Sequence, residues 1–289
     1  MPKLKNVIIM GATSLIGPYV CSRLADEGFT VECFSRKPKI IKCSSKHTFR
    51  WREFDIKNPG DWHAPTGVII ISLLPLQILF QLLPRLKKAE QIIAVSTTSV
   101  FTKKQSKDRK ERNLINCMIS CEREIIKFST GFKINWTIMR PTLVYGAGQD
   151  NNISAISYFI KKFGFFIVAR PASGLRQPVH ADDVAQAIVA AINNKDASNT
   201  SFNLGGGETL TYLNMVKRIF ESTGRRPIII CLPSGVLSFA LCCFNLVFRS
   251  SYSPALFYRM NQDFVFDFTP ANSILRYNPR PLNNKKPDI

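Results

Sequence analysis

The chain has few of the residues that build metal sites and disulfide frameworks. Its three histidines are far apart, and none of its eight cysteines, at positions 21, 33, 43, 117, 121, 231, 242 and 243, belongs to a C-x-x-C pair. Zinc sites need closely spaced cysteine and histidine ligands, and disulfide frameworks are typical of small secreted proteins. We therefore expect no metal site, and we expect a reducing compartment such as the cytoplasm. A strand is predicted from residue 6 onwards, so we also expect no cleaved signal peptide.

Acidic residues are scarce as well. The chain has 39 Lys and Arg residues against 20 Asp and Glu residues, which gives a formal net charge of +19. This surplus favours an acidic partner such as a nucleotide, a nucleic acid or an anionic membrane, and a merely basic, solvated surface explains it equally well. No RNA- or DNA-binding motif accompanies the charge, so a nucleic-acid partner is not favoured.

Residues 6–17, NVIIMGATSLIG, predict a dinucleotide-binding turn. Residues 7–10 are an apolar run, typical of a strand buried on both faces. Apolar residues then recur at helical spacing, at Leu15, Ile16, Val20 and Leu24. Gly11 lets the backbone turn, Gly17 lets the helix pack closely on the strand, and N–H groups at the helix start face the phosphates. The hydroxyl of Ser14, between these glycines, can donate to a phosphate oxygen.

A second strand is predicted over Thr30–Phe34, followed by Ser35, Arg36 and Lys37. An acidic residue at this strand end binds the adenosine ribose 2′-hydroxyl of NAD, whereas a basic residue accommodates the 2′-phosphate of NADP. The Arg-Lys pair therefore favours NADP over NAD. The alternative is that both residues are solvated cations of a turn.

Strands and helices alternate through the first half of the chain. Strands are predicted at 48–54, 67–72, 91–96 and 135–139, and helices at 76–86 and 113–128. This alternation implies right-handed crossovers and a parallel sheet covered by helices on both faces. The predicted fold class is α/β, a Rossmann-type doubly wound parallel sheet with a smaller C-terminal substrate-side cap.

The pattern loosens after residue 140. Helices are predicted at 182–193, with Asp182 as the N-cap, and at 211–223, with a short strand at 202–204 between them. We expect an NAD(P)-binding Rossmann domain over residues 1–225, with its core at 1–150 and cap elements interleaved from about 150. Residues 226–289 are expected to form a C-terminal cap and tail, of which 278–289 is frayed.

Residues 228–248 form an apolar stretch of 21 residues without a charge. Its length suffices to span a bilayer. However, Pro233-Ser234-Gly235 divides it into a short strand and a helix of about thirteen residues, which is too short to cross the hydrocarbon layer. We expect a buried or surface-docked helix, with peripheral membrane contact as the first alternative and a membrane span as the second.

Four motifs occur in one order along residues 6–225. They are GATSLIG at 11–17, STTSVF at 96–101, MRPTLVYG at 139–146 and RQPVHADDVAQAI at 176–188. Together they resemble the extended or atypical short-chain dehydrogenases, that is, the NAD-dependent epimerase/dehydratase family. More loosely, RMNQDFVFDFTPA at 259–271 and YNPRP at 277–281 resemble tail segments of sugar-nucleotide epimerases.

The resemblance implies a cofactor site and a catalytic position. The residues implied to bind the cofactor are Gly11, Thr13, Ser14, Leu15, Ile16 and Gly17 at the pyrophosphate, Arg36 at the adenosine phosphate, Asp55 and Ile56 at the adenine, Ser72 and Leu73 at the nicotinamide ribose, and Arg140 and Pro141 over the nicotinamide. Thr97 is implied as the catalytic Ser/Thr. Asp183 is implied near the cap helix and is equally well explained as a charge in the first turn of that helix.

The family's Y-x-x-x-K pair is missing. In family members the tyrosine exchanges a proton with a substrate hydroxyl while the lysine lowers its pKa. This chain has no tyrosine between Thr102 and Val144. The two positions are Leu114 and Met118 if Glu122 marks the register, or Asn116 and Ser120 if Glu124 does. Tyr145, by its place in the motif, and His180, by its ordinary pKa range, are therefore further catalytic candidates, and a structural role explains each of them as well.

Three hypotheses follow. The first is an NAD(P)-dependent oxidoreductase or epimerase that acts on a nucleotide-sugar, in which Arg176 and Arg259 bind the substrate diphosphate through bidentate guanidinium contacts. The second is a catalytically inactive, NADP(H)-binding sensor or assembly subunit that is membrane-adjacent and resembles the dehydrogenase-like accessory subunit of respiratory complex I. The third, a nucleic-acid-associated protein, rests on charge alone. The family's habit also implies a homodimer formed through residues 76–87 and 113–128.

Overall fold

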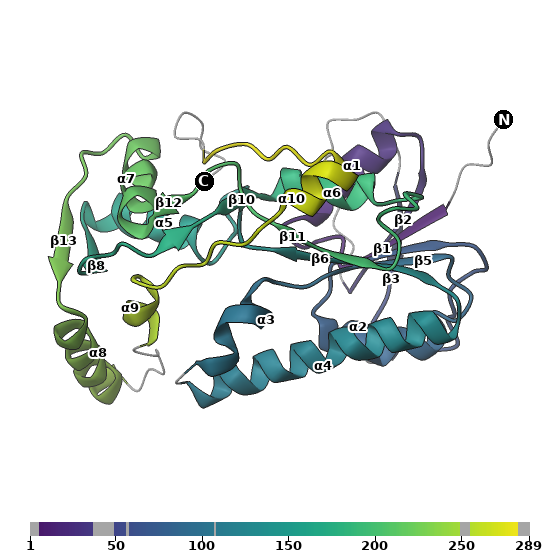
Figure 1. Cartoon of the computed structure of the whole chain (residues 1–289), viewed down its shortest axis with the longest axis horizontal. Coiled ribbons are helices and arrows are strands. Elements are labelled where there is room, and N and C mark those ends of the chain that lie inside the picture. The colour runs from purple at the N-terminus through teal and green to yellow at the C-terminus, as the bar shows by residue number, and fades with distance from the viewer. Residues whose placement is uncertain (1–5, 37–48, 56–57, 107, 249–254, 283–289) are drawn as a thin grey trace.

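The computed structural model describes residues 6–36, 49–55, 58–106, 108–248 and 255–282. Its centre is a seven-stranded sheet in the order β11-β6-β5-β4-β1-β2-β3 (Figure 1), and every neighbouring pair is parallel. The strands are β1 (Asn6–Met10), β2 (Thr30–Ser35), β3 (Arg50–Glu53), β4 (Ile69–Ser72), β5 (Gln91–Val95), β6 (Asn135–Pro141) and β11 (Thr200–Leu204). The chain enters at the middle of the sheet and winds outwards in both directions, which confirms the predicted Rossmann-type fold.

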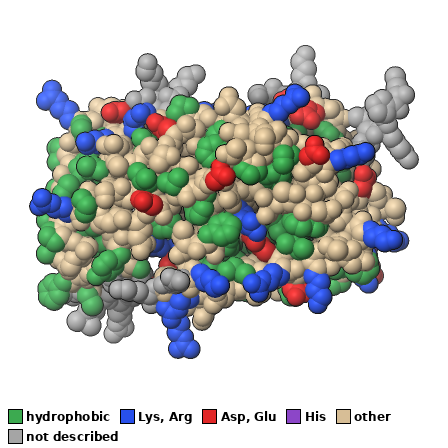
Figure 2. All heavy atoms as spheres, viewed as in Figure 1, with side chains coloured by type: hydrophobic (Ala, Val, Ile, Leu, Met, Phe, Trp, Pro, Cys, Tyr) green, Lys and Arg blue, Asp and Glu red, His purple; other side chains and the backbone are tan. Residues whose placement is uncertain are grey.

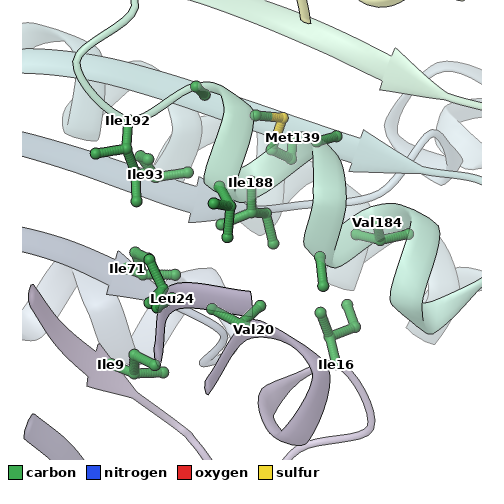
Figure 3. Close-up of a cluster of buried hydrophobic side chains, with 14 of the residues drawn as sticks. Ile9, Ile16, Val20, Leu24, Ile71, Ile93, Met139, Val184, Ile188 and Ile192 are labelled. Atoms are coloured by element: carbon green, nitrogen blue, oxygen red, sulfur yellow. The ribbon is translucent and has the colours of Figure 1, made fainter. Parts of the chain in front are cut away.

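Helices cover both faces of this sheet (Figure 1). One face carries α1 (Gly17–Asp26), α6 (Ala181–Ala190) and α10 (Thr269–Leu275), and the other carries α2 (Leu76–Leu82) and α4 (Arg109–Gly131). The apolar run of β1 serves both layers, because successive side chains of a strand point to opposite faces. Val7 and Ile9 join the core under α1 and α6, and Ile8 and Met10 join the core under α2 and α4. Figure 3 shows the first of these cores, where Ile9 lies below Val20 and Leu24.

A smaller cap has its own core. It consists of α5 (Ile153–Phe163), β8 (Phe166–Ala169), α7 (Tyr212–Ser222) and β13 (Ile229–Leu232), and β13 pairs with β8 in parallel. The helices α8 (Ser234–Phe248) and α9 (Ala255–Arg259) follow. Three short helical elements belong to the sheet domain, namely η1 (Leu83–Arg85) after α2, and α3 (Ser99–Thr102) and η2 (Lys103–Gln105) between β5 and α4. The short strands are β7 (Leu143–Tyr145), β9 (Leu175–Arg176), β10 (Pro178–His180) and β12 (Leu210–Thr211).

The segment 228–248 divides as its sequence predicts, into strand β13 and helix α8. Among the described residues, no helix is both long and apolar enough to cross a membrane. The predicted cap of the helix near residue 182 was wrong. The N-cap is His180, whose ring Nδ1 accepts a hydrogen bond from the Asp182 N–H at 3.1 Å, because the helix begins one residue earlier than its charge pattern suggested.

The predicted frayed tail was also wrong for residues 278–282. The guanidinium of Arg280 contacts the carboxylates of Asp182 and Asp183 at 2.6 and 2.8 Å. Glu208 accepts a hydrogen bond from the Leu282 N–H at 2.8 Å, and the Leu282 side chain is buried. Carboxylates far away in the sequence therefore hold this part of the tail against α6, and residues 283–289 lie outside the described part of the chain.

The turn between β1 and α1 requires both of its glycines. Gly11 has φ +81°, a conformation that favours glycine, and a Cβ at this position would lie 3.2 Å from the Leu73 carbonyl carbon. A Cβ on Gly17 would lie 2.0 Å from the Ala12 carbonyl oxygen. The first turn of α1 therefore packs directly on the backbone that leaves β1, at a distance that no side chain permits.

We predict that Gly17→Ala destabilises the protein by at least about 2 kcal/mol, because the backbone of the turn must move to accept the methyl group. The control is Gly131→Ala in α4, where a Cβ meets nothing within 4 Å and alanine is the better helix former. Urea unfolding followed by circular dichroism measures both variants. Equal midpoints for the two variants would contradict the close packing of α1 on β1.

Candidate cofactor site and substrate cleft

The glycine turn lies at the carboxyl end of β1, between β4 and β2, where the winding of the sheet reverses direction. The Gly11 N–H donates to the Phe34 carbonyl at 3.3 Å, and the Leu73 N–H donates to the Met10 carbonyl at 2.9 Å. These bonds hold the turn against both neighbouring strands. In open α/β sheets this reversal point leaves a crevice in which ligands bind.

Three buried hydroxyl groups at this edge of the sheet have no hydrogen-bond partner among the described residues. They belong to Ser14 in the turn, Ser72 at the end of β4 and Ser96 directly after β5. A buried polar group without a partner costs free energy, so such groups are rare unless a ligand or water satisfies them. Their place beside the glycine turn fits a polar ligand such as a dinucleotide.

The remaining residues of the predicted cofactor site lie around this edge. Thr13, Arg36 and Asp55 are exposed, with Arg36 directly after β2. Leu15 is half-buried and Ile16 is buried. Lys37 and Ile56 lie outside the described residues, so the structure gives no position for the predicted Arg-Lys pair as a whole.

Arg140 has protein partners at its place in β6. Its guanidinium forms two hydrogen bonds with Glu122, at 2.6 and 3.1 Å, and a third with the Ser201 hydroxyl at 2.8 Å. The ring of Phe101 lies 5.2 Å from the same group. The neighbouring Pro141 carbonyl accepts a hydrogen bond from the Thr98 N–H. Both predicted cofactor residues thus also hold α4 and the β5 loop to the sheet.

The contact of Glu122 bears on where the missing tyrosine and lysine of the family would lie in α4, since either Glu122 or Glu124 can mark the register. Glu122 is buried and ion-paired, whereas Glu124 is exposed. With Glu122 as the mark, the two positions are Leu114, which is 55% exposed, and Met118, which packs on the core under α4. Residues four apart share one face of a helix, so these three side chains form one stripe. Neither leucine nor methionine exchanges a proton.

A cleft of about 550 Å³ lies next to this edge, between the sheet and the cap. Its polar walls include Thr97, Thr98 and Ser99 after β5, Asn151 and Asn152 before α5, and Lys103, Arg176, Gln177, Tyr212 and Arg259. Its apolar side includes Ile156, Phe159, Phe166, Met215, Met260 and Phe264. A volume of this size suits a small-molecule ligand.

Arg176 is a buried cation in the wall of this cleft. Its guanidinium donates to the carbonyls of Leu175, Gln262 and Arg259, at 2.8, 2.6 and 2.5 Å. The Phe264 ring lies 4.4 Å from it, and no described carboxylate forms an ion pair with it. Burial lowers the pKa of Arg176 to about 10, which still leaves it charged at neutral pH. A buried positive charge without a paired anion makes this wall attractive to an anionic ligand.

Arg259, also in the wall of the cleft, is paired with Glu111. The Arg259 guanidinium lies 2.5 Å from the Glu111 carboxylate, and the Lys103 ammonium lies 2.9 Å from the same oxygen. The Ser106 hydroxyl donates to the other oxygen at 2.6 Å. Glu111 therefore joins α4 to α9 across the mouth of the cleft. Burial alone would raise the pKa of Glu111, but its contacts with Ser106, Lys103 and Arg259 together lower it.

The three catalytic candidates are divided between the cleft and the interior. Thr97 lines the cleft, and its hydroxyl accepts a hydrogen bond from the Ser99 N–H at 3.2 Å. Tyr145 and His180 are both buried, with ring centroids 5.2 Å apart in an edge-to-face contact, and neither lines the cleft. The His180 Nδ1 accepts the capping hydrogen bond from the Asp182 N–H, which gives this ring a structural role at the start of α6. Asp183 accepts hydrogen bonds from Arg280, which gives it a structural role.

The sequence did not single out several residues of the cleft. Lys103, Glu111 and Tyr212 were missed, because a charged residue or a tyrosine near the start of a helix is usually solvated or part of ordinary packing. The signal for Tyr212 was its place directly after Thr211, which caps α7. Burial raises the pKa of the Tyr212 phenol to about 12, so it stays protonated beside Arg176. Burial and the neighbouring Cys117 raise the pKa of the Cys121 thiol on α4 to about 11.

Residues 77–205 match the family model "NAD dependent epimerase/dehydratase family". This stretch, 129 of the 289 residues, is similar to that family. The match contains three of the four motifs, with Thr97, Arg140, Tyr145 and His180 among its residues, and it confirms the resemblance on which these candidates rest. The description calls the family NAD-dependent. This description does not distinguish NADP from NAD as the cofactor of this chain.

Two relatives and one solved structure illustrate the similarity. The chain is 28% identical over 243 residues to "Chloroplast stem-loop binding protein of 41 kDa b, chloroplastic" of Arabidopsis thaliana, covering 76% of this chain and 64% of the relative. It is 33% identical over 98 residues to "NADH dehydrogenase [ubiquinone] 1 alpha subcomplex subunit 9, mitochondrial" of the same plant, covering 34% of this chain and 24% of the relative. The chain thus spans less than two thirds of either relative's length.

The UDP-glucuronic acid 4-epimerase of Bacillus cereus in complex with NAD has the same fold. The two structures agree with a TM-score of 0.72 at 18% identity, over 96% of this chain and 93% of the epimerase. The cap is included in this coverage. The predicted combination of a Rossmann-type sheet and a smaller cap is therefore the fold of a known epimerase.

We predict that the Glu111 bridge contributes to stability in a pH-dependent way. Because the folded-state pKa of Glu111 is lowered, its contribution is complete above the ordinary carboxylate pKa of about 4.3 and is lost as the pH falls through the folded-state value. The difference in urea midpoint between the wild type and Glu111→Gln should therefore be largest near neutral pH and shrink in acid. A difference that is constant with pH would contradict the bridge.

Proposed function

We propose that this protein binds NADP(H) in preference to NAD(H) and acts as an oxidoreductase or epimerase on a nucleotide-sugar. The observation that carries the proposal is the juxtaposition of two sites. A glycine turn with partnerless hydroxyls nearby lies at the reversal point of the sheet, and a cleft lined by Arg176 and Arg259 begins at Thr97, the residue after the partnerless Ser96. One site suits a dinucleotide and the other suits an anionic small molecule.

The cofactor would be held by the residues at the reversal point. The turn 11–17 would receive the pyrophosphate, Arg36 the adenosine 2′-phosphate, and Asp55 and Ile56 the adenine. Ser72 and Leu73 would lie beside the nicotinamide ribose, and Arg140 and Pro141 would lie behind the ring. When bound, a nicotinamide accepts or delivers a hydride at a sugar carbon. The preference for NADP rests on Arg36, an exposed cation at the end of β2.

The substrate would lie in the cleft. Arg176 and Arg259 would contact its diphosphate, since guanidinium groups match phosphate oxygens. For Arg259 this means that the phosphate competes with Glu111, whose carboxylate lies 2.5 Å from it. The UDP-glucuronic acid 4-epimerase of similar fold supports a nucleotide-sugar as the substrate class.

Thr97 carries the catalytic part of the proposal, because it is the only one of the three candidates that lines the cleft. Its hydroxyl would orient a sugar hydroxyl. A threonine does not accept a proton at neutral pH without a base, so a further group must take it. Tyr145, by its motif position, and His180, by the ordinary pKa range of histidine, are proposed for this step. Their burial outside the cleft weighs against both.

A second candidate function is a cofactor-binding subunit without turnover. The absence of an acid or a base at the expected positions, which are Leu114 and Met118 or Asn116 and Ser120 depending on the register, favours it. The match to a NADH dehydrogenase subunit points the same way but covers only 34% of this chain. We place it second because the cleft and its cations are present. A cytoplasmic location and a homodimer formed through α2 and α4 complete the proposal as secondary parts.

We predict that the purified protein binds NADPH at micromolar concentrations and that Arg36→Glu weakens NADPH binding at least about tenfold while leaving NADH binding unchanged. NADPH fluorescence during titration measures both. The control is Arg123→Glu on the exposed side of α4, which should change neither. No binding of either dinucleotide to the wild type would contradict both candidate functions.

For turnover, we predict that at least one member of a panel of UDP-, GDP- and dTDP-sugars is epimerised or oxidised, as observed by proton NMR. Thr97→Val should lower kcat about a hundredfold or more with little effect on NADPH binding. Tight NADPH binding with no converted sugar would contradict the enzyme and favour the cofactor-binding subunit.

A further inference from the structure

One end of the molecule is built from chain without acidic residues. Segments 151–181 and 222–262 contain no Asp or Glu and hold eight Lys and Arg residues. They form α5, β8, β13, α8 and α9, which contact one another in turn at the cap end of the molecule (Figure 1). Helix α7, packed on α5, adds Lys217, Arg218 and Glu221, so the positive surplus of this end remains.

Helix α8 exposes apolar side chains at this end. It comprises 15 residues without a charge. Over residues 234–242, for which side-chain exposure is described, Leu237 is the only buried side chain. Val236 is 53% exposed and Phe239 is 73% exposed. A helix that is apolar on all sides is normally covered, either by protein or by lipid.

Neighbouring elements extend the apolar surface. Ile228 and Ile230, two residues apart at the start of β13, are both exposed and therefore lie on one side of the strand. On α5, Tyr158 is 66% and Phe163 52% exposed, and the Lys162 ammonium lies 6.0 and 5.3 Å from their ring centroids. Aromatic rings with a lysine beside them are typical of membrane interfaces. Figure 2 shows hydrophobic and basic side chains together at this end.

We propose that this cap-end surface, made of α8, residues 228–230 and the last turns of α5, docks on a bilayer of anionic phospholipid. The apolar side chains would enter the headgroup region, and the exposed cations Lys161, Lys162, Arg225 and Arg226 would contact lipid phosphates. Helix α8 lies on the membrane and does not span it, since 15 residues extend about 22 Å and the hydrocarbon layer is about 30 Å thick.

Charge decides between a membrane and a second copy of the chain. A symmetric dimer through this surface would bring the cations Lys161, Lys162, Arg225 and Arg226 of the two copies face to face. The two segments that form the surface supply no carboxylate to pair with these cations. An anionic bilayer supplies the missing negative charge. The proposal does not depend on what the cleft binds.

Co-sedimentation of the full chain with vesicles tests the proposal. Binding to phosphatidylcholine vesicles that contain phosphatidylglycerol should exceed binding to pure phosphatidylcholine vesicles at least about tenfold, and high salt should release much of the bound protein. Phe239→Glu and Lys162→Glu should each weaken binding about tenfold.

The matched controls are Phe132→Glu, directly after α4, and Lys195→Glu, between α6 and β11, which are exposed residues of the same types away from the cap and outside the proposed dimer surface. They should bind vesicles like the wild type, and circular dichroism should show that all four variants fold. Equal binding to both vesicle types, or binding unaffected by Phe239→Glu and Lys162→Glu, would overturn the proposal. The proposal would also be overturned if the protein did not bind vesicles and light scattering showed a dimer that Phe239→Glu dissociates.

Discussion

The close contact between α1 and β1 is the constraint on which the rest of this structure depends. A Cβ on Gly17 would lie 2.0 Å from the Ala12 carbonyl oxygen, so the helix approaches the strand as far as a backbone permits. This approach places the core of α1 and α6 against the sheet and brings the N–H groups of the turn to the crevice between β1 and β4. The same geometry therefore sets both the packing of one layer and the position of the candidate cofactor site.

Helix α4 connects the two halves of the molecule through its acidic residues. Glu122 pairs with Arg140 in the sheet, and Glu111 pairs with Arg259 in the cap. Between them on the helix lie Leu114 and Met118, which are the two positions of the missing pair if Glu122 marks the register. In that register α4 has the charges that position it and no proton-exchanging side chain, which is why turnover is the part of the proposal that most needs a test.

The sequence predicts this fold well because its signals are local. The apolar run 7–10, the turn glycines and the alternation of strands with helices each depend on neighbouring residues. The contacts that it could not predict join distant residues. The His180 cap was missed because histidine is an uncommon cap, and the ordered tail was missed because Asp182 and Asp183, which hold Arg280, lie almost a hundred residues away.

The same division holds for the candidate site. Thr97 and Arg176, each within a motif, line the cleft, whereas the motif residues Tyr145 and His180 are buried and do not line it, since sequence proximity does not fix the direction of a side chain. Glu111 and Lys103 became visible only when α4, η2 and α9 were seen together.

The central claim is that the turn and its partnerless hydroxyls form a dinucleotide site. Its most direct test is a crystal structure of the protein grown with NADP. We expect the pyrophosphate against residues 11–17, with hydroxyls of Ser14, Ser72 or Ser96 bonded to the cofactor and Arg36 at the 2′-phosphate. A crevice that stays empty at saturating NADP, or a cofactor bound elsewhere, would contradict the account.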